Sequence, residues 1–507
     1  MRKPFARLWG SLLLGILGSV GALKAQESLP VDVLPLSQVR PGMKGYGKSV
    51  FRGTRIETFE VEVLGVLERW DSAGGHVILV RITSGPPVER GAQVIAGMSG
   101  SPIYLQDKVA GAIAYGWGFS KEPIAGVRPI EDMLKALEEA KREEARQFSP
   151  SPPSVPVAYR PRSPLRVAGE PISRVLLYER VPPSLEPLPH TGYLLPMGGV
   201  LQVGGLSPRT LEWLRPRLEA WGFEVVQGPG ASSEVEPVEL EPGAALGVQL
   251  MTGDIDAAAI GTVTYRQGDY VLAFGHPFAQ LSGAELPVST ARVIEILPSL
   301  SRSFKFGATM EVVGSLIYDD FHAIVATLAR RPRMIPVTVS VHALARNRHR
   351  TLSVQVLGDR DLAPSLILGA LAEPVQVEFG QVKEAMVRTL TEVKPVGRPP
   401  LRREDRFFGR GFLDFRAIDD LASMLSLVTA NIFEPTDVEW VSVEVSMEPG
   451  RRTALIERVE VDRDVVQPGD TVQLTVALRP YRADRVIRTL SLKVPDAAPP
   501  GVAQLGV

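Results

Sequence analysis

Residues 97–102 read Gly97-Met98-Ser99-Gly100-Ser101-Pro102, and residues 103–116 after them have the pattern of a strand, a tight turn and a second strand. Glycines on both sides of a serine let the backbone turn sharply and point its amides at one spot. The amides of Gly97 and Ser99 are then placed to form an oxyanion hole. We therefore take Ser99 as the candidate nucleophile. A Gly/Ser-rich β-turn without chemistry is the alternative interpretation.

A nucleophilic hydroxyl needs a base, and the chain offers six histidines and no cysteine. Histidine is the side chain that titrates nearest neutrality. His276 follows the apolar stretch 270–274 in an abrupt strand-to-turn segment, which places its ring at the rim of a sheet. His322, beside Asp319 and Asp320, is the second candidate. We expect His276 to be the base, with a purely structural histidine as the alternative.

Composition favours a multidomain, mainly β protein. The chain has 507 residues, of which 45% are hydrophobic, so it can bury several cores. Its 47 glycines and 43 prolines favour many turns between short strands. A formal charge of -1 argues against nucleic acid or an anionic membrane surface as a partner. The lack of cysteine excludes disulfides and thiolate metal sites.

The N-terminus has the pattern of a secretory signal peptide. Arg2, Lys3 and Arg7 precede an apolar stretch, 8–23, and cleavage is expected after Ala25. An uncleaved anchor is the alternative, because Leu23 is bulkier than the usual residue near a cleavage site. No other stretch is long and apolar enough to span a membrane. We expect an exported protein, periplasmic or extracellular, with no membrane span after cleavage.

Changes in pattern divide the chain into seven parts, with helices expected at 129–148, after Ser207, and at 417–432. The parts are a signal peptide (1–25), a β-rich block with Ser99 (31–148), a Pro-rich linker (149–165), a small α/β insert (166–242), a second β-rich block with His276 (243–357), a mixed connector with a helix (358–450), and a C-terminal β-sandwich of immunoglobulin-like type (451–507).

Two stretches, 97–103 and 261–276, together resemble the SpoIVB family of serine peptidases, a distant branch of the chymotrypsin-like fold. The resemblance implies that Ser99 is the nucleophile, that His276 is the general base, and that Ala114, Tyr115 and Gly116 line the substrate pocket. It also implies a double β-barrel built from blocks 31–148 and 243–357. The serine half comes first here, so the halves are in swapped order, as in a circular permutation.

The sequence departs from the family at the third member of the catalytic triad. The family has an aspartate some fifteen residues before the nucleophile, and Ser84 stands there instead. A carboxylate at this position fixes the histidine tautomer and stabilises the imidazolium. Ser84 can accept a hydrogen bond, or an acid from elsewhere, such as Asp254, Asp256 or Glu285, can fill the gap. The sequence leaves these alternatives open.

Two functions remain in competition. The first is an exported serine endopeptidase that acts on itself or on envelope proteins through Ser99 and His276. The second is a catalytically inert, peptidase-like scaffold or sensor that binds a protein partner, because Ser84 replaces the acid. Neither requires a cofactor or a metal, and the Asp254-Ile255-Asp256 segment is the only weak candidate for Ca²⁺. The oligomeric state is not indicated by the sequence.

Overall fold

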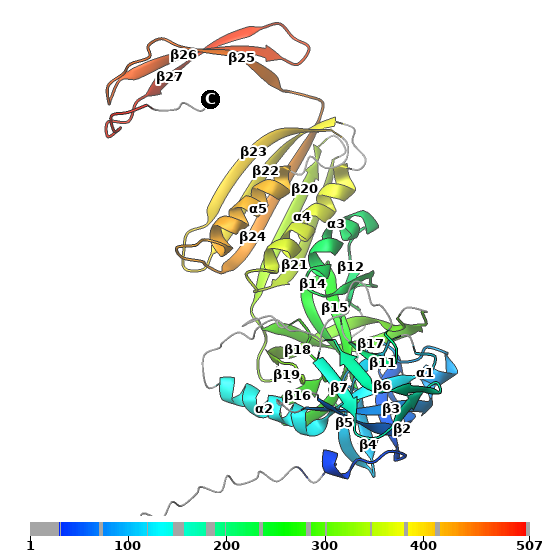
Figure 1. The fold of residues 1–507 in the computed structure, drawn as a ribbon. Coiled ribbons are helices and arrows are strands. Elements are labelled where there is room, and N and C mark those ends of the chain that lie inside the picture. The colour runs from blue at the N-terminus through cyan, green and yellow to red at the C-terminus, as the bar shows by residue number, and fades with distance from the viewer. Residues whose placement is uncertain are drawn as a thin grey trace, which may run out of the picture.

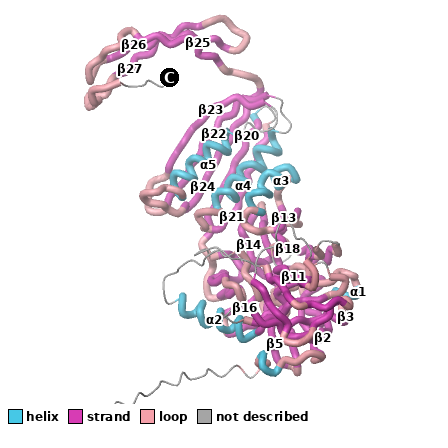
Figure 2. The backbone as a smooth tube through the Cα atoms, in the orientation of Figure 1, coloured by secondary structure: helices cyan, strands magenta, loops and turns pink. Residues whose placement is uncertain are grey.

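The computed structural model describes residues 30, 32–69, 75–118, 120–144, 157–178, 188–197, 199–232, 237–279, 285–299, 302–344, 347–379, 384–410 and 416–502. The predicted signal peptide and the first half of the Pro-rich linker lie outside these ranges. The described chain is mainly β, as the composition predicts, and its parts are stacked along one long direction (Figure 1). Figure 2 shows how far strands outnumber helices in every part.

Nine strands of the N-terminal part form one sheet, and six of them pair in a closed cycle. The cycle runs β1–β2–β3–β6–β5–β4 and back to β1, and every pairing in it is antiparallel. The strands of this sheet are β1 (Lys44–Arg52), β2 (Arg55–Arg69), β3 (His76–Ser84), β4 (Pro102–Leu105), β5 (Lys108–Trp117), β6 (Ile124–Pro129), β7 (Val157–Pro161), β10 (Arg174–Leu177) and β11 (Thr191–Pro196).

A second closed cycle lies in residues 245–327. It runs β14–β15–β16–β19–β18–β17 and back to β14, again with antiparallel pairing throughout. Strands β15 and β16 form a hairpin that turns at residues 267–270. The strands are β14 (Ala245–Gly253), β15 (Asp256–Gln267), β16 (Tyr270–Ala273), β17 (Leu286–Leu297), β18 (Phe304–Asp319) and β19 (Ile324–Thr327).

Short elements connect and flank the two cycles. The strands of the predicted insert join both sheets: β10 and β11 extend the first, and the parallel pair of β12 and β13 extends the second. The predicted cap is confirmed, because Ser207 Oγ accepts a hydrogen bond from the Thr210 amide at the start of α3. These elements are the 3₁₀ turn η1 (Leu36–Gln38), α1 (Pro86–Glu89), α2 (Ile130–Glu144), β8 (Leu165–Val167), β9 (Glu170–Ile172), β12 (Val200–Gly204), α3 (Pro208–Glu219) and β13 (Glu224–Gln227).

The next part extends the second sheet through β21, β20, β24, β22 and β23, with two helices on one face (Figure 1). The predicted helix near 417–432 is found as α5, whereas α4 was not predicted individually. The apolar residues of α4 show no single helical stripe, because this helix is buried against α3, α5 and the sheet. The elements are β20 (Met334–Ala343), β21 (Arg348–Leu357), α4 (Ala363–Phe379), β22 (Glu384–Pro395), β23 (Leu401–Arg410), α5 (Arg416–Thr429) and β24 (Val438–Pro449).

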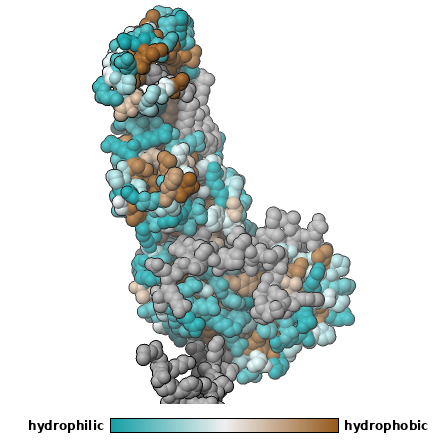
Figure 3. Space-filling view, turned by 60° about the vertical axis from the view of Figure 1, so that its left-hand side comes forward, coloured by the Kyte–Doolittle hydropathy of each residue, from teal (hydrophilic) through white to brown (hydrophobic). Residues whose placement is uncertain are grey.

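The C-terminal part is one antiparallel sheet of β25 (Ala454–Val461), β26 (Thr471–Pro480) and β27 (Val486–Lys493). Val472, Leu474 and Val476 form its small core. The described residues supply no second sheet to face it, so the immunoglobulin-like sandwich is not confirmed. Figure 3 shows hydrophobic surface on this part, consistent with the exposure of Leu455 and Ile487. Among the described helices, none is long and apolar enough to cross a membrane.

Candidate active site

The turn that carries Ser99 is held against β15. Gly97 and Gly100 have φ angles of 97° and 91°, which L side chains rarely adopt. A Cβ at Gly100 would lie 1.9 Å from the Thr262 carbonyl oxygen, so the backbones approach as closely as a glycine allows. The Thr262 amide donates to the Ser99 carbonyl at 2.8 Å, and Thr264 Oγ1 donates to the Gly100 carbonyl at 2.7 Å. The second strand cycle therefore anchors the turn supplied by the first.

His276 lies in the segment after β16 that packs on β5. Gly275 has a φ of 72°, and a Cβ there would lie 3.1 Å from the Ala114 Cβ. The imidazole centroid is 5.6 Å from the Phe274 ring and 6.3 Å from the Tyr115 ring. The Phe278 and Ala279 amides, just beyond the histidine, donate to the carboxylate of Asp319 at 2.7 and 2.9 Å. Tight packing and this carboxylate fix the path of the segment.

The hydrogen bond of His276 sets its tautomer. Nδ1 lies 2.7 Å from the Pro277 carbonyl oxygen, which can only accept, so Nδ1 must carry the proton. Nε2 of the neutral ring is then an unprotonated acceptor. Burial lowers the pKa of His276 to about 4, and the Pro277 carbonyl opposes that shift only in part. The imidazole is therefore neutral at pH 7, in the tautomer that a general base requires.

Ser99 Oγ and His276 Nε2 have complementary needs. Both atoms are buried, and neither has a hydrogen-bond partner among the residues that the structure describes. Ser99 Oγ is a donor without an acceptor, and His276 Nε2 is an acceptor without a donor. The two segments that carry them pack against each other around Gly100 and Phe274. Ser99 and His276 are 0% and 1% exposed. In this conformation the pair is closed to solvent and its hydrogen bond is not formed.

The backbone before Ser99 is oriented by β18. The Ala96 amide donates to the Ser303 carbonyl at 2.8 Å, and the Lys305 amide donates to the Ala96 carbonyl at 2.9 Å. Because a trans peptide points its C=O and N–H in opposite directions, the second bond turns the Gly97 N–H away from β18. Within the described part of the chain, neither the Gly97 nor the Ser99 amide donates a hydrogen bond. Both amides that the sequence predicts for an oxyanion hole are thus available.

Sequence reasoning missed the buried amine beneath this turn. Lys305 Nζ donates to Ser49 Oγ at 2.8 Å and to Thr262 Oγ1 at 3.3 Å, and Thr262 Oγ1 donates to the Gly97 carbonyl at 2.8 Å. Ser101 Oγ also donates to Ser49 Oγ, at 2.9 Å. All of these side chains are buried. The only signal in the sequence was a lysine within the second β-rich block, 243–357, where a lysine ordinarily indicates a solvated face.

Burial lowers the pKa of Lys305 to about 7, and no carboxylate in the described residues pairs with its amine. Two hydroxyls accept its hydrogen bonds, and the centroid of the Phe51 ring lies 5.6 Å from Nζ. The aliphatic part of the same side chain packs on the turn: a Cβ at Gly97 would lie 3.0 Å from Lys305 Cδ. Lys305 therefore supports the backbone around Gly97 in three ways. Its amide binds the Ala96 carbonyl, its stem packs on Gly97, and its amine reaches the Gly97 carbonyl through Thr262.

None of the acids considered for the third triad position is a hydrogen-bond partner of His276 in the described structure. Ser84 ends β3 opposite Glu60. Asp254 accepts from the Ser353 amide at 2.7 Å, and Glu285 pairs with Arg330 at 2.7 Å. Asp256 accepts from Gln249 and Thr309, and burial raises its pKa to about 6. The Pro277 carbonyl accepts the hydrogen bond from His276 Nδ1 instead.

The other predicted positions are placed as follows. Ala114 and Tyr115 are fully buried, and a Cβ at Gly116 would lie 2.5 Å from Met197 Sδ. Arg128, also fully buried, donates to the Tyr115 hydroxyl and, at 3.4 Å, to the Gly275 carbonyl. His322, the second histidine candidate, is paired with Asp320 at 3.0 Å. A buried cation thus contacts Tyr115, one of the three residues predicted to line the substrate pocket.

In the described part of the chain, no group of three or more His, Asp or Glu side chains could hold a metal ion. Asp254 and Asp256, the weak Ca²⁺ candidates, bond to different partners: the Ser353 amide in one case, and Gln249 and Thr309 in the other.

The comparison with protein families bears directly on the turn. Residues 10–134 match the SpoIVB peptidase S55 family. The match contains the first of the two motifs, residues 97–103, and supports the assignment to the SpoIVB peptidase family. The matched range includes Ser99, the Gly97 amide and the pocket positions 114–116, and it ends before His276 and Lys305. No curated protein and no solved structure matches the chain.

Proposed function

We propose that the chain is a SpoIVB-like serine endopeptidase, exported from the cytoplasm, that cleaves itself or envelope proteins. The two closed strand cycles support a chymotrypsin-like double barrel in swapped order, with Ser99 from the first cycle facing a segment of the second. The observation that carries the proposal is the pair of buried atoms, Ser99 Oγ and His276 Nε2, each lacking the partner that the other would supply.

The proposed chemistry follows from these groups. Ser99 Oγ attacks a peptide carbonyl while His276 Nε2 accepts its proton, and the Gly97 and Ser99 amides stabilise the oxyanion that forms. The imidazolium then protonates the leaving amine, and water releases the acyl group by the reverse sequence. The Pro277 carbonyl performs one task of the missing aspartate, because it fixes the tautomer. It carries no charge, so it stabilises the imidazolium less than a carboxylate does.

The burial of Ser99 and His276 adds a requirement for catalysis. Because Ser99 and His276 are closed to solvent, a substrate carbonyl reaches Ser99 only after the covering segments separate. We therefore expect slow turnover that rises when a partner or substrate opens the site. Self-cleavage and cleavage of a few envelope proteins suit such a closed site better than general digestion does.

Labelling by a fluorophosphonate probe tests the proposal. The wild-type protein should label, Ser99→Ala should not, and Ser101→Ala should still label, because Ser101 Oγ is engaged with Ser49 in the hydroxyl network. His276→Gln should lower the labelling rate by roughly 10³ or more, as loss of a triad member does. Equal labelling of wild type and Ser99→Ala would refute Ser99 as the nucleophile.

The inert scaffold remains the second candidate, favoured by the closed site and by the uncharged partner of His276. It predicts a folded wild type that does not label under any condition and a partner complex that survives Ser99→Ala. Loss of that complex in Ser99→Ala alone would count against it.

A further inference from the structure

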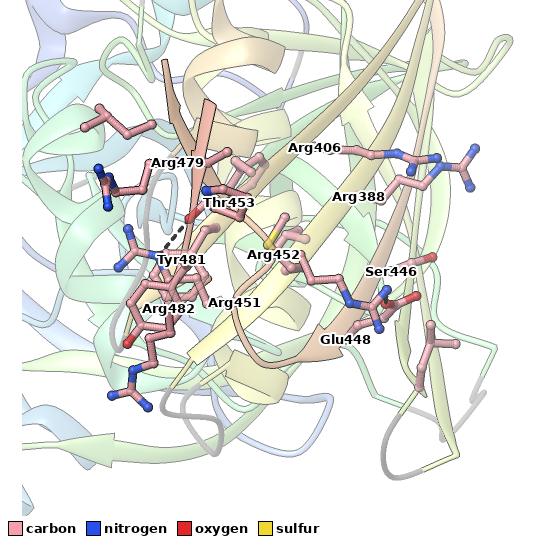
Figure 4. A pocket seen from close by; sticks show the side chains of 18 residues that line it. Arg388, Arg406, Ser446, Glu448, Arg451, Arg452, Thr453, Arg479, Tyr481 and Arg482 are labelled. Carbon is pink, nitrogen blue, oxygen red and sulfur yellow. Dashed lines mark hydrogen bonds and ion pairs between the residues drawn. The ribbon is translucent and has the colours of Figure 1, made fainter. Parts of the chain in front are cut away.

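A cleft far from Ser99 lies between the β22–β24 sheet and the C-terminal sheet. It has a volume of about 1010 Å³. Its lining includes one glutamate, Glu448, and six arginines: Arg388, Arg406, Arg451, Arg452, Arg479 and Arg482. Figure 4 shows Arg388 and Arg406 on one side of the cleft and Arg479 and Arg482 on the other. For a chain with a formal charge of -1, this is a marked local concentration of positive charge.

Two of these arginines carry uncompensated charge. Arg451 and Arg482 form no ion pair with any described carboxylate. The Arg451 guanidinium lies 4.9 Å from the Phe408 ring centroid and 4.4 Å from that of Tyr481, and its Nε donates to Thr453 Oγ1 at 2.8 Å. Arg482 lies 5.1 Å from the same tyrosine ring. Aromatic stacking holds a guanidinium in place and leaves its remaining N–H donors available.

The other four arginines show which ligand chemistry the cleft accepts. Arg388 and Arg406 both bind the Glu404 carboxylate, at 2.7 and 3.3 Å, Arg452 binds Glu448 at 3.3 Å, and Arg479 binds Glu457. Arginine forks match the geometry of carboxylates. These internal pairs leave a surplus of positive charge, so further carboxylates from outside the chain suit the cleft.

An extended chain fits better than a small anion. The cleft includes Ala454 and Leu455, the first residues of β25. In the described part of the chain β25 pairs only with β26, and all of its residues are exposed. Its other edge therefore presents backbone N–H and C=O groups to which an extended peptide can add as a strand. Met386 and Phe408 supply apolar surface beside the arginines.

We propose that this cleft, defined by the six arginines named above, binds an acidic, extended peptide segment of a protein partner or substrate. The site is independent of the chemistry at Ser99 and would serve either a peptidase or a scaffold. Carboxylates of the segment pair with Arg451 and Arg482, and its backbone runs along the open edge of β25.

Fluorescence anisotropy of the full-length protein with a labelled glutamate-rich octapeptide tests this. The double variant Arg451→Glu/Arg482→Glu should weaken binding by at least about tenfold, and affinity should fall as salt rises. The matched control Arg463→Glu/Arg488→Glu makes the same charge change at two exposed positions outside the cleft, in the β25–β26 connection and in β27, and it should bind nearly as wild type.

Equal weakening in both double variants would indicate a diffuse charge effect and would overturn the proposal. No binding of the acidic peptide by a folded wild type would also overturn it. So would stronger binding of a single-stranded DNA oligonucleotide or of phosphatidylglycerol vesicles than of the peptide. Inorganic phosphate that displaces the peptide at low millimolar concentration would instead indicate a small-anion site and would also overturn it. Labelling at Ser99 is measured separately, so failure here leaves the proposed function untouched.

Discussion

The side chain of Lys305 packs directly on Gly97: a Cβ at residue 97 would lie within 3.0–3.2 Å of three carbons of the lysine stem. The amine at the end of that stem reaches Ser49 and Thr262, and Thr262 holds the Gly97 carbonyl. A buried lysine without a carboxylate therefore supports the turn that presents Ser99. Its position makes the stability of the turn dependent on pH.

Replacing Lys305 by methionine should remove a pH-dependent part of the stability. An unfolded lysine has a pKa near 10.4 and burial lowers the pKa of Lys305 to about 7, so the unfolded chain binds more protons between these values. The unfolding free energy of the wild type, relative to Lys305→Met, should therefore rise with pH across this window, by up to about 5 kcal/mol. Urea denaturation from pH 6.5 to 10 measures it. The control Lys108→Met removes an exposed lysine, and parallel curves for wild type and Lys305→Met would contradict the prediction.

His276 should give a second pH dependence at lower pH. Burial lowers its pKa to about 4, below the value of about 6.5 for an unfolded histidine, so the unfolded chain binds more protons between the two. The contribution is fully present above pH 6.5 and is lost as pH falls toward 4, on the order of 3 kcal/mol in total. His276→Gln should lose this slope, whereas His190→Gln, at an exposed position, should keep it. A wild type that loses no stability relative to His276→Gln in this range would show that the imidazole is not buried as described.

Gly100→Ala should be strongly destabilising. The new Cβ would lie 1.9 Å from the Thr262 carbonyl oxygen and 2.6 Å from the Phe274 nitrogen, and φ at this position is 91°. Both neighbours are backbone and cannot swing aside, so we expect a loss of roughly 4 kcal/mol or more in unfolding free energy. Gly268→Ala is the matched control, because its φ is 61° and nothing lies within 4 Å of its Cβ. It should cost only about 1 kcal/mol. Similar costs at the two sites would argue against the close contact between the turn and β15.

Thr262→Val tests the hydroxyl that joins Lys305 to the turn. Valine keeps the shape but leaves the Gly97 carbonyl without its side-chain donor and Lys305 with one fewer partner, so we expect a loss of about 1–3 kcal/mol. If the turn forms the oxyanion hole, the rate of fluorophosphonate labelling should fall roughly tenfold or more. Thr262→Ser restores the hydroxyl and should recover most of both. If Thr262→Ser recovered stability but not labelling, the hydroxyl would stabilise the fold without positioning the turn for catalysis, which would contradict the prediction.

Much of the local structure was readable from short stretches of sequence. Helices were expected at 129–148, after Ser207 and at 417–432, and the structure has α2, α3 and α5 there. These features depend on neighbours in the chain, so local periodicity and turn chemistry suffice. Helix α4 escaped notice because a helix buried on several sides has no polar face to set its period.

The sequence by itself indicated the family and made Ser99 and His276 the candidates for nucleophile and base, because glycine spacing and a strand-ending histidine are local patterns. Only the tertiary structure decided what surrounds them. Lys305 reaches Ser49 across 256 residues, and the Pro277 carbonyl, not Ser84, holds His276. Such contacts follow from the pairing and packing of distant strands, which bring together residues that no short-range pattern relates.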